Sequence, residues 1–422
     1  MNKLVVMFVF ISFFRIGYAQ KIDNKIKLSL NDAIETALNN NAEISSAKKE
    51  IDAAAGKVFQ AGRLQNAQFS LQMNEVSNRF TPGDVGQYDL SFSQPLEFFG
   101  KRTTRIQSAE FQKEIAGKSF ERVKSLIASR VKKTYYRGLL SKQIAQSIEA
   151  NITLLDDFLA QVTNRYQAGT SNYLDVIRAK VELARLKNEL FEAKKEQWKI
   201  IGELKVLLGK ESGYEFELTD SLTYRFLEMK KDSIVSFYSS RSNYLRINEI
   251  QADQSKSYLS LAEKKYLPDF NLGLAYQYHQ FLPVKGFYQY LGLNIGISLP
   301  MFYSSGVPGD IQEAEANLSI SDIRLKYSKL KVAQNIITAF NNLSFAEEQL
   351  RLFETSLIKD VEDQLRAGIT AYQNLQIDVL NLFDIYRIYR ATKVEYSKTV
   401  FNCLAALAEL EVAAEEAPLN LP

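Results

Sequence analysis

The sequence has little of what most enzymes and metal proteins depend on. Its 422 residues include a single histidine, His279, and a single cysteine, Cys403. One cysteine cannot form an intrachain disulfide, and we interpret it as a small buried apolar residue. Histidine-based acid–base catalysis and metal binding by several histidines have no residues to assemble from. Because phosphate-binding glycine loops, dinucleotide fingerprints and nucleophile elbows are also missing, we expect no enzyme, no cofactor and no metal site.

A marked net charge is also absent. The 52 basic and 49 acidic residues give a formal charge of +3, whereas nucleic-acid-binding proteins carry a clear basic excess. We therefore expect no nucleic-acid partner.

Long apolar runs are missing apart from one near the N-terminus. Residues 4–14 are uncharged and apolar, follow Lys3 and precede Gly17 and Ala19. This arrangement is typical of a secretory signal peptide, and the run is too short to span a bilayer as a helix. We predict a signal peptide over residues 1–19, with cleavage between Ala19 and Gln20. A short membrane anchor is the alternative.

Proline is scarce and grouped. Six of the eight prolines fall within 82–95 and 268–308, which leaves 96–267 and 309–417 without any. Because proline interrupts helices, these two tracts, rich in Ala, Leu, Glu, Lys and Gln, predict long helices. The two proline-containing windows instead alternate apolar and polar residues and predict β-hairpins. We expect strands at about 67–77 and 87–95, and at about 269–281 and 287–299.

The chain reads as a tandem repeat. Phe69 corresponds to Phe270, 201 positions on, and the IQSAE at 106–110 corresponds to the IQEAE at 311–315, 205 positions on. A glycine turn at Gly169 is matched to Gly368, 199 positions on. Each repeat is then helix, hairpin, long helix, glycine turn and helix. We expect a first repeat over 20–208, a linker over 209–230, a second repeat over 231–410 and a tail over 411–422.

Four two-faced strands raise the question of what covers their apolar face. Unpaired strand edges are costly in lipid, and the smallest outer-membrane barrels use eight strands. Either the strands form a soluble sheet or several chains pool them, and the export signal favours pooling. Aromatic residues cluster at the turn end of the second hairpin, where a membrane-interface girdle is preferred over a soluble core. They are Tyr276, Tyr278, Phe281, Phe287, Tyr288 and Tyr290.

Several segments together resemble the TolC family of outer-membrane efflux proteins. They are LSLNDAIETALNNNAEI at the start, SQPLEFFGKR and SLPMFYSSG after the second and fourth strands, KKYLPDFNLGLAY before the third, and the two AG turns. The QPLEFFGKR segment most resembles the CzcC/CusC heavy-metal efflux branch. The resemblance implies a mainly α fold with a membrane β part: a homotrimer with a twelve-stranded barrel in outer-membrane lipid, continued by a helical periplasmic tunnel.

The resemblance also implies a function. The expected protein is the outer-membrane channel of a tripartite efflux system, which passively conducts substrate from a periplasmic adaptor and an inner-membrane pump, of the resistance-nodulation-division type, to the exterior. Heavy-metal cations are the expected cargo. Drug efflux and type I secretion are alternatives, and an exported coiled-coil scaffold without a pore is the alternative from another class.

Candidate site residues follow from the same resemblance. The hairpin tips, where the adaptor would dock, are placed at Gly169 and Thr170 and at Gly368 and Ile369. Acidic residues just after the tips would narrow the pore, and the candidates are Asp175, Asn374 and Asp378. Stabilisation of a helix start is an equally plausible role for Asp175.

The passage from strand to helix is the last candidate site. Pro95 is expected to end strand pairing, Gly100 to give the bend, and Lys101 and Arg102 to begin the aqueous side. Pro300 is the matching proline in the second repeat. The basic cluster, which includes Arg105, either contacts anionic headgroups or forms a solvated or salt-bridged collar at the barrel's periplasmic rim, and the collar is preferred.

Overall fold

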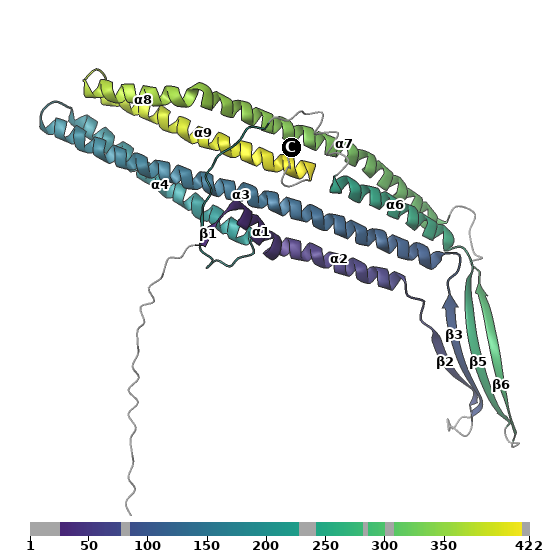
Figure 1. The fold of residues 1–422 in the computed structure, drawn as a ribbon. Helices are drawn as coiled ribbons and strands as arrows, with labels where there is room; N and C mark the ends of the chain where they lie inside the picture. Colours follow the sequence, from purple (N-terminus) through teal and green to yellow (C-terminus); the bar gives the residue numbers. More distant parts are fainter. Residues whose placement is uncertain (1–25, 77–84, 228–241, 282–285, 300–307, 416–422) are drawn as a thin grey trace, which may run out of the picture.

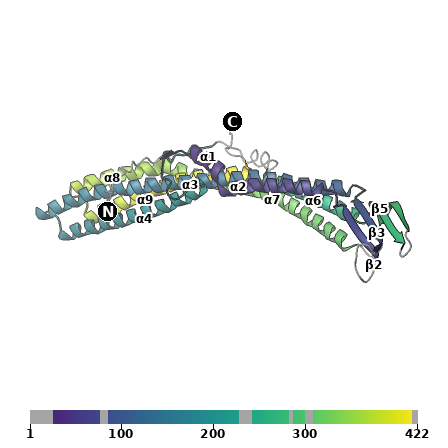
Figure 2. The ribbon, with the colours of Figure 1, turned by 90° about the horizontal axis from the view of Figure 1, so that it is seen from below.

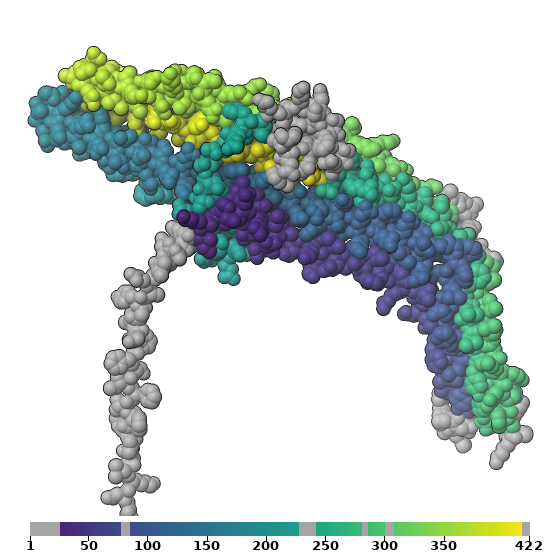
Figure 3. All heavy atoms as spheres, in the orientation of Figure 1, coloured from purple at the N-terminus to yellow at the C-terminus, as the bar shows by residue number. Residues whose placement is uncertain are grey.

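The computed structural model describes residues 26–76, 85–227, 242–281, 286–299 and 308–415. The expected signal peptide with Ala19 and Gln20, and also Pro300, lie outside these residues. The described chain is a long, bent rod: helices run along most of its length, a β-sheet forms one end and two helical hairpins form the other (Figures 1 and 2). Figure 3 shows the sheet turning away from the helical body.

Helices make up most of the described chain. They are α1 (Leu30–Asn40), α2 (Ala42–Ala61), α3 (Lys101–Gln167), α4 (Tyr173–Leu207), α6 (Asn243–Lys264), α7 (Gly309–Leu352), the π-helical η2 (Phe353–Leu357), α8 (Ile358–Gln373) and α9 (Val379–Ala414). The strands are β1 (Ile26–Leu28), β2 (Gln68–Val76), β3 (Val85–Leu96), β4 (Phe216–Leu218), β5 (Asp269–Phe281) and β6 (Gly286–Ser298). The expected fold class, mainly α with two β-hairpins, is confirmed.

The longest helix, α3, extends over 67 residues without a break. Its sequence holds no proline, so every backbone N–H after the first turn can bond within the helix. Several shorter helices begin at side-chain caps, as where Asn41 accepts from the backbone N–H groups of Glu43 and Ile44 at the start of α2. None of the described helices combines the length and the apolar character needed to cross a membrane.

A buried core joins the N-terminal segment to the middle of the first long helical hairpin. β1 and β4 pair in parallel, with Leu28 opposite Leu218, and pack with α1 on α3. The fully buried Tyr135 of α3 donates its hydroxyl hydrogen bond here, with Leu28 O at 2.8 Å and Asp220 Oδ2 at 2.7 Å. Burial and the Asp220 carboxylate raise the pKa of this phenol well above its ordinary value. The core therefore holds the long helices together at mid-length.

The two hairpins form one sheet in the order β2-β3-β5-β6, and all neighbours are antiparallel. The register aligns apolar residues across the strands: Phe69 faces Phe92, which faces Leu274, which faces Leu293. One step along, Ser70 faces Ser91 in the same way, and their hydroxyls lie 2.7 Å apart. The sheet thus has an apolar face and a polar face, and the apolar side chains are exposed, as Leu293 is to 64%.

A single π-helical turn distinguishes the second long helix from the first. Ile106 and Ile311 are 205 positions apart, but the Tyr-Gln pairs that end α3 and α8, at 166–167 and 372–373, are 206 apart. The π segment Phe353–Leu357 lies between these points. A π turn joins residue i to i+5 and holds one residue more than an α turn. The turn therefore absorbs one inserted residue and keeps the two helices in register at their ends.

Candidate functional site at the two ends of the molecule

The first hairpin tip closes α3 with a glycine in the left-handed region. Gly169 has φ 74°, and its N–H donates to Tyr166 O at 3.0 Å while the N–H of Thr170 donates to Arg165 O at 2.9 Å. These bonds satisfy carbonyls that the end of a helix leaves free. Asn172 then caps α4 by accepting from Leu174 N–H at 3.1 Å. Gly169 and Thr170 lie at the turn, where the sequence places them.

The second tip does not lie at Gly368, and that part of the prediction is wrong. Gly368 is buried inside α8, and its neighbour Ile369 is an exposed residue of the same helix. A Cβ placed on Gly368 would lie 2.7 Å from Cδ1 of Ile385 in α9. This glycine is thus explained by the close approach of two helices and not by a turn.

Leu375 takes the place that the sequence analysis gave to Gly368. It has φ 59°, its N–H donates to Tyr372 O at 3.1 Å, and the N–H of Gln376 donates to Ala371 O at 2.8 Å. The bonds match those of the first tip, shifted by 206 positions, with Leu375 in the role of Gly169. The signal that could have located it is the repeated Tyr-Gln pair rather than the repeated Ala-Gly pair.

The corrected correspondence also moves the acidic candidates. Asn374 follows the last residue of α8 and does not correspond to Asp175, whose equivalent is Asn381. Asp378 corresponds to Asn172 and caps α9 by accepting from Asn381 N–H at 2.8 Å.

Asp175 lies in the first turn of α4. Its carboxylate accepts from Ser171 Oγ at 3.2 Å and lies 3.5 Å from Nη1 of Arg178. Together with the cap at Asp378, this places both aspartates at helix starts, where a negative charge is favourable. The positions of both aspartates therefore suit stabilisation of a helix start, through a cap at Asp378 and a first-turn charge at Asp175.

A hydrophobic cluster joins the two tips. Phe158 of α3 packs its ring against Tyr372 and Phe383 from the second hairpin, with centroids 5.3 and 5.5 Å away. The guanidinium of Arg165 lies 4.8 Å from the centre of the Tyr372 ring. Burial raises the pKa of the Tyr372 phenol. A cavity of about 270 Å³ lies beside this cluster, between α3, α8 and α9.

At the opposite end, Gly100 turns the chain from strand into helix. It precedes α3 with φ 74°, a conformation that favours glycine. Lys101 follows, and its buried ammonium donates to Asp269 Oδ1 and to Leu267 O, each at 2.8 Å. Lys101 therefore links the start of α3 to the start of β5, and it is a buried ion-paired residue rather than one that faces water.

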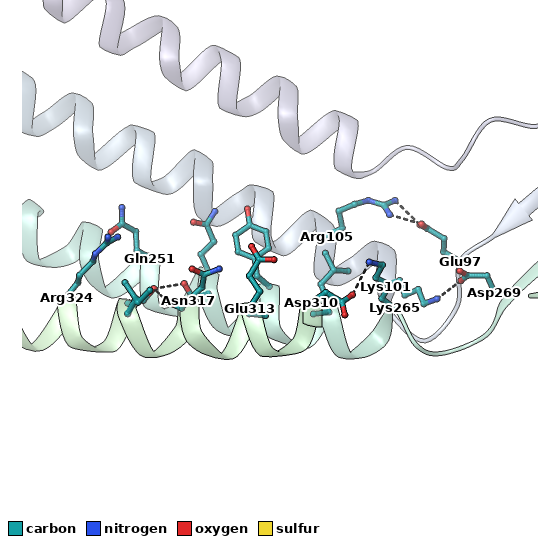
Figure 4. Close-up of a pocket in the computed structure, with 18 of the residues that line it drawn as sticks. Glu97, Lys101, Arg105, Gln251, Lys265, Asp269, Asp310, Glu313, Asn317 and Arg324 are labelled. Carbon is teal, nitrogen blue, oxygen red and sulfur yellow. Dashed lines mark hydrogen bonds and ion pairs between the residues drawn. The ribbon is translucent and has the colours of Figure 1, made fainter. Parts of the chain in front are cut away.

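Two arginines tie α3 to the end of α2. Arg105 forms a two-pronged ion pair with Glu97 at 2.7 and 2.8 Å and donates to Ala61 O at 2.9 Å. Arg102 donates to Gly62 O at 2.7 Å. The hydrogen bonds from Arg105 hold the pKa of the Glu97 carboxyl below its ordinary value. Within the described chain, Lys101 and Arg105 are thus paired with acids and Arg102 with a backbone carbonyl, and Figure 4 shows the Glu97 pair in its setting.

The expected role of Pro95 needs a correction. Pairing of β3 with β2 stops at Ser93, but pairing with β5 continues through Pro95, opposite Asn271, to Leu96, opposite Phe270. Pro95 therefore does not end the strand. It lies where β3 has lost its β2 neighbour, and a residue without an N–H is tolerated on such an open edge.

A large cavity lies beside this collar. Its volume is about 810 Å³, and residues of α3, α6 and α7 line it (Figure 4). Several charged groups on its wall are paired, as Lys265 is with Asp310 at 3.0 Å and Lys101 with Asp269. Across the described ranges, no three His, Cys, Asp or Glu side chains are grouped so that they could hold a metal ion.

Comparison with known proteins fits this architecture. Residues 33–210, which contain the first β-hairpin and the first helical tip, match the family model described as "Outer membrane efflux protein". Over these residues the chain belongs to the outer membrane efflux protein family, also called the TolC family. As a member it is an outer-membrane channel of a tripartite efflux system, which confirms the expected location and that the protein is not an enzyme.

Individual relatives of this efflux protein are distant. It is 20% identical over 369 residues to the "Cobalt-zinc-cadmium resistance protein CzcC" of Cupriavidus metallidurans, covering 87% of this chain and 85% of that one. It is also 20% identical over 278 residues to the "Putative multidrug resistance outer membrane protein MdtQ" of Escherichia coli, covering 63% of this chain and 55% of that one.

Solved structures share the fold. A structure of CusC matches with a TM-score of 0.77 at 15% identity, covering 92% of both chains. VceC of Vibrio cholerae matches with a TM-score of 0.76 at 17% identity, covering 92% of this chain and 96% of that one.

Proposed function

We propose that three copies of this efflux protein close a barrel by pairing β6 of one copy with β2 of the next. The observation that carries the proposal is the four-stranded sheet, which has an exposed apolar face and two open edges, β2 and β6. Backbone groups at an open edge are costly in lipid. Three sheets joined edge to edge give twelve strands with the apolar face toward lipid and the polar face toward the lumen.

The cargo that we propose is heavy-metal cations. The support is the resemblance to CzcC, whose name records cobalt, zinc and cadmium resistance, and the fold shared with CusC. The channel would conduct passively, and an inner-membrane pump of the resistance-nodulation-division type would supply the energy through a periplasmic adaptor. Multidrug efflux is the second candidate, because MdtQ is similar over 278 residues.

The adaptor would dock at the hairpin tips, which form the end of the molecule farthest from the sheet (Figure 1). We place the contact at Gly169 and Thr170 on the first tip and at Leu375 on the second. The Leu375 side chain is 73% exposed and is therefore accessible to a partner protein. Asp175 and Asp378, at the helix starts beside the tips, would line the narrow end of the tunnel.

Two neighbouring substitutions on β6 test the barrel. Leu293 belongs to the apolar face and Asn294 to the polar face. Leu293→Arg places a charge in lipid, which costs about 2–4 kcal/mol near the midplane, and should abolish the heat-sensitive trimer in outer-membrane fractions. Asn294→Arg, which points to the lumen, should leave the trimer intact. A trimer that tolerates both changes equally, or a soluble monomer from the unchanged chain, contradicts the barrel.

Deletion of the gene tests the cargo. The mutant strain should become sensitive to cobalt, zinc or cadmium salts, with complementation restoring growth. Sensitivity to amphiphilic drugs without sensitivity to metal salts would instead support the multidrug candidate. Loss of a secreted protein in the culture medium would point to type I secretion.

A further inference from the structure

The polar face of the sheet is almost free of charge. Its residues alternate with the apolar ones along each strand and are aligned by the register of the four strands. They are Gln68, Ser70, Gln72 and Asn74 of β2; Gln87, Asp89, Ser91, Ser93 and Pro95 of β3; Asp269, Asn271, Gly273, Ala275, Gln277 and His279 of β5; and Tyr288, Tyr290, Gly292, Asn294, Gly296 and Ser298 of β6. Asp89 and Asp269 are the two Asp, Glu, Lys or Arg residues in this set, and Asp269 lies at its junction end, paired with Lys101.

The Asp89 carboxylate has amide neighbours and no cation in the contacts of the described chain. Asn74 Nδ2 donates to its Oδ2 at 2.8 Å, and Gln87 Nε2 donates to Oδ1 and Oδ2 at 2.9 and 2.8 Å. The residues directly opposite, Gln72 and Gln277, are also amides. Amide hydrogen bonds hold the carboxylate in place but do not cancel its charge.

Two nearby acids contact a lysine or a histidine, which Asp89 does not. Asp269, at the junction end of β5, lies 2.8 Å from the Lys101 ammonium. Glu75, next to the last polar residue of β2, lies 3.3 Å from Nε2 of His279. Asp89 is therefore the acid of the sheet whose described side-chain contacts are amides, with no lysine, arginine or histidine among them.

We propose that Asp89 is a determinant of cation preference in the barrel of this channel. The inference rests on the proposed trimer, in which threefold symmetry brings three Asp89 carboxylates to one height of the lumen. Rings of Asp or Glu make pores selective for cations, and a channel wall of low dielectric constant strengthens the field of such a ring. The cargo class that this ring favours is small cations, divalent ions above all.

The ring attracts cations without trapping them. Each carboxylate stands alone between amides, and the described part of the chain offers no cluster of three metal-ligating side chains around it. Conduction requires attraction strong enough for entry and weak enough for release. A single uncancelled charge per protomer meets both conditions, whereas a complete ligand set would hold the ion.

Purified trimers in planar bilayers test the proposal by their reversal potential in a potassium chloride gradient. Asp89→Asn keeps the shape of the side chain and should lower the potassium-to-chloride permeability ratio by about twofold or more, because three charges leave one cross-section. Asp89→Asn with Gln277→Asp moves the carboxylate to the facing residue and should restore the ratio. Gln277→Lys, which retains Asp89 but places a cation opposite it, should lower the ratio as Asp89→Asn does.

The outcomes separate the two proposals. Conducting Asp89→Asn trimers with an unchanged ratio overturn the role of Asp89 and leave the channel function standing. If Asp89→Asn does not assemble, Gln277→Lys decides: a lowered ratio supports the proposal and an unchanged ratio overturns it. Failure of the unchanged protein to form conducting trimers overturns the proposed channel and, with it, the ring.

Discussion

Leu375 and Gly169 hold the same left-handed backbone position at the two hairpin tips, with φ values of 59° and 74°. The hydrogen bonds that close the preceding helices match residue for residue. The two tips therefore share a backbone and differ in side chain, because one presents only a glycine while the other presents an exposed leucine.

The shared backbone position predicts that substitutions at Leu375 and Gly169 have opposite effects on the stability of the two tips. A residue with a Cβ in the left-handed region costs about 1–2 kcal/mol, and the mostly exposed Leu375 side chain recovers little of this by packing. Leu375→Gly should stabilise the second tip and slow amide hydrogen exchange at the end of α8, whereas Gly169→Leu should speed exchange at the end of α3. Faster exchange in Leu375→Gly would contradict the account.

The π turn predicts that the second long helix tolerates a deletion that the first does not. Removal of the exposed Thr355 should convert the π segment into α-helix and leave both flanks in register, so the detergent-solubilised trimer should keep its melting temperature within a few degrees.

Removal of the exposed Ala150 is the matched control in α3. It rotates all following residues by about 100° and turns Leu155 and Val162 out of the tip core, so the trimer should lose its thermal stability. Equal loss from the two deletions would show that the π turn does not absorb the extra residue.

The ion pair between Glu97 and Arg105 predicts a stability that depends on pH. Because the folded-state pKa of Glu97 lies below its ordinary value, the pair stabilises the protein fully above about pH 4.5, and the contribution is lost as the pH falls through the lowered pKa. Glu97→Gln should lower stability by about 1–3 kcal/mol at pH 7, measured by thermal unfolding in detergent.

The same variant supplies the control for the pH effect. Between pH 5 and pH 3 the unfolding temperature of Glu97→Gln should fall less steeply than that of the unchanged protein. Parallel curves over this range would show that the pair carries no pH-dependent stability.

The close contact at Gly368 predicts that a larger residue there destabilises the protein, and that a smaller residue at Ile385 restores part of the stability. Gly368→Ala places a Cβ against Cδ1 of Ile385 and should cost about 1–3 kcal/mol through overpacking. Ile385→Val removes that methyl, so the double variant should recover part of the loss. Gly117→Ala is the control, because a Cβ there meets nothing within 4 Å, and this change should stabilise α3 by about 1 kcal/mol. Equal destabilisation at both glycines would contradict the close contact.

The sequence carried enough local information to predict the helices and the hairpins. The proline-free tract 96–267 predicts a long helix and contains α3. The period-two alternation of Phe69, Leu71 and Met73 predicts a strand with two faces. These are short-range patterns, because a proline or a strand period acts on the residues next to it.

The second tip could not be located in the same way. The Ala-Gly pair at 367–368 resembles the first tip in sequence, but its glycine serves a contact with Ile385 that only the folded chain brings about. One inserted residue, hidden in a π turn, shifted the true correspondence from 205 to 206 positions. Insertions of one residue leave the helical pattern almost unchanged, so composition and periodicity do not reveal them.

The junction contacts were equally out of reach of pattern reasoning. Lys101 was expected to face water, yet it pairs with Asp269, 168 positions away. No spacing rule links two such residues until the strand order places β5 beside β3. Asp89 likewise stands out only after the register has sorted the strand residues into two faces.

α3 extends without a break from the strand-to-helix junction to the first tip, and side chains of its first turns bond to neighbouring elements. Lys101, Arg102 and Arg105 fasten its first turns to β5 and α2, while its far end, about 100 Å away at 1.5 Å per residue, carries the first tip. A tilt of about 5° at the junction displaces the tip by about 9 Å over that length. In the proposed trimer, a small change of angle at the junction would therefore become a large displacement at the tips, and the core around Tyr135 is the contact that restrains it.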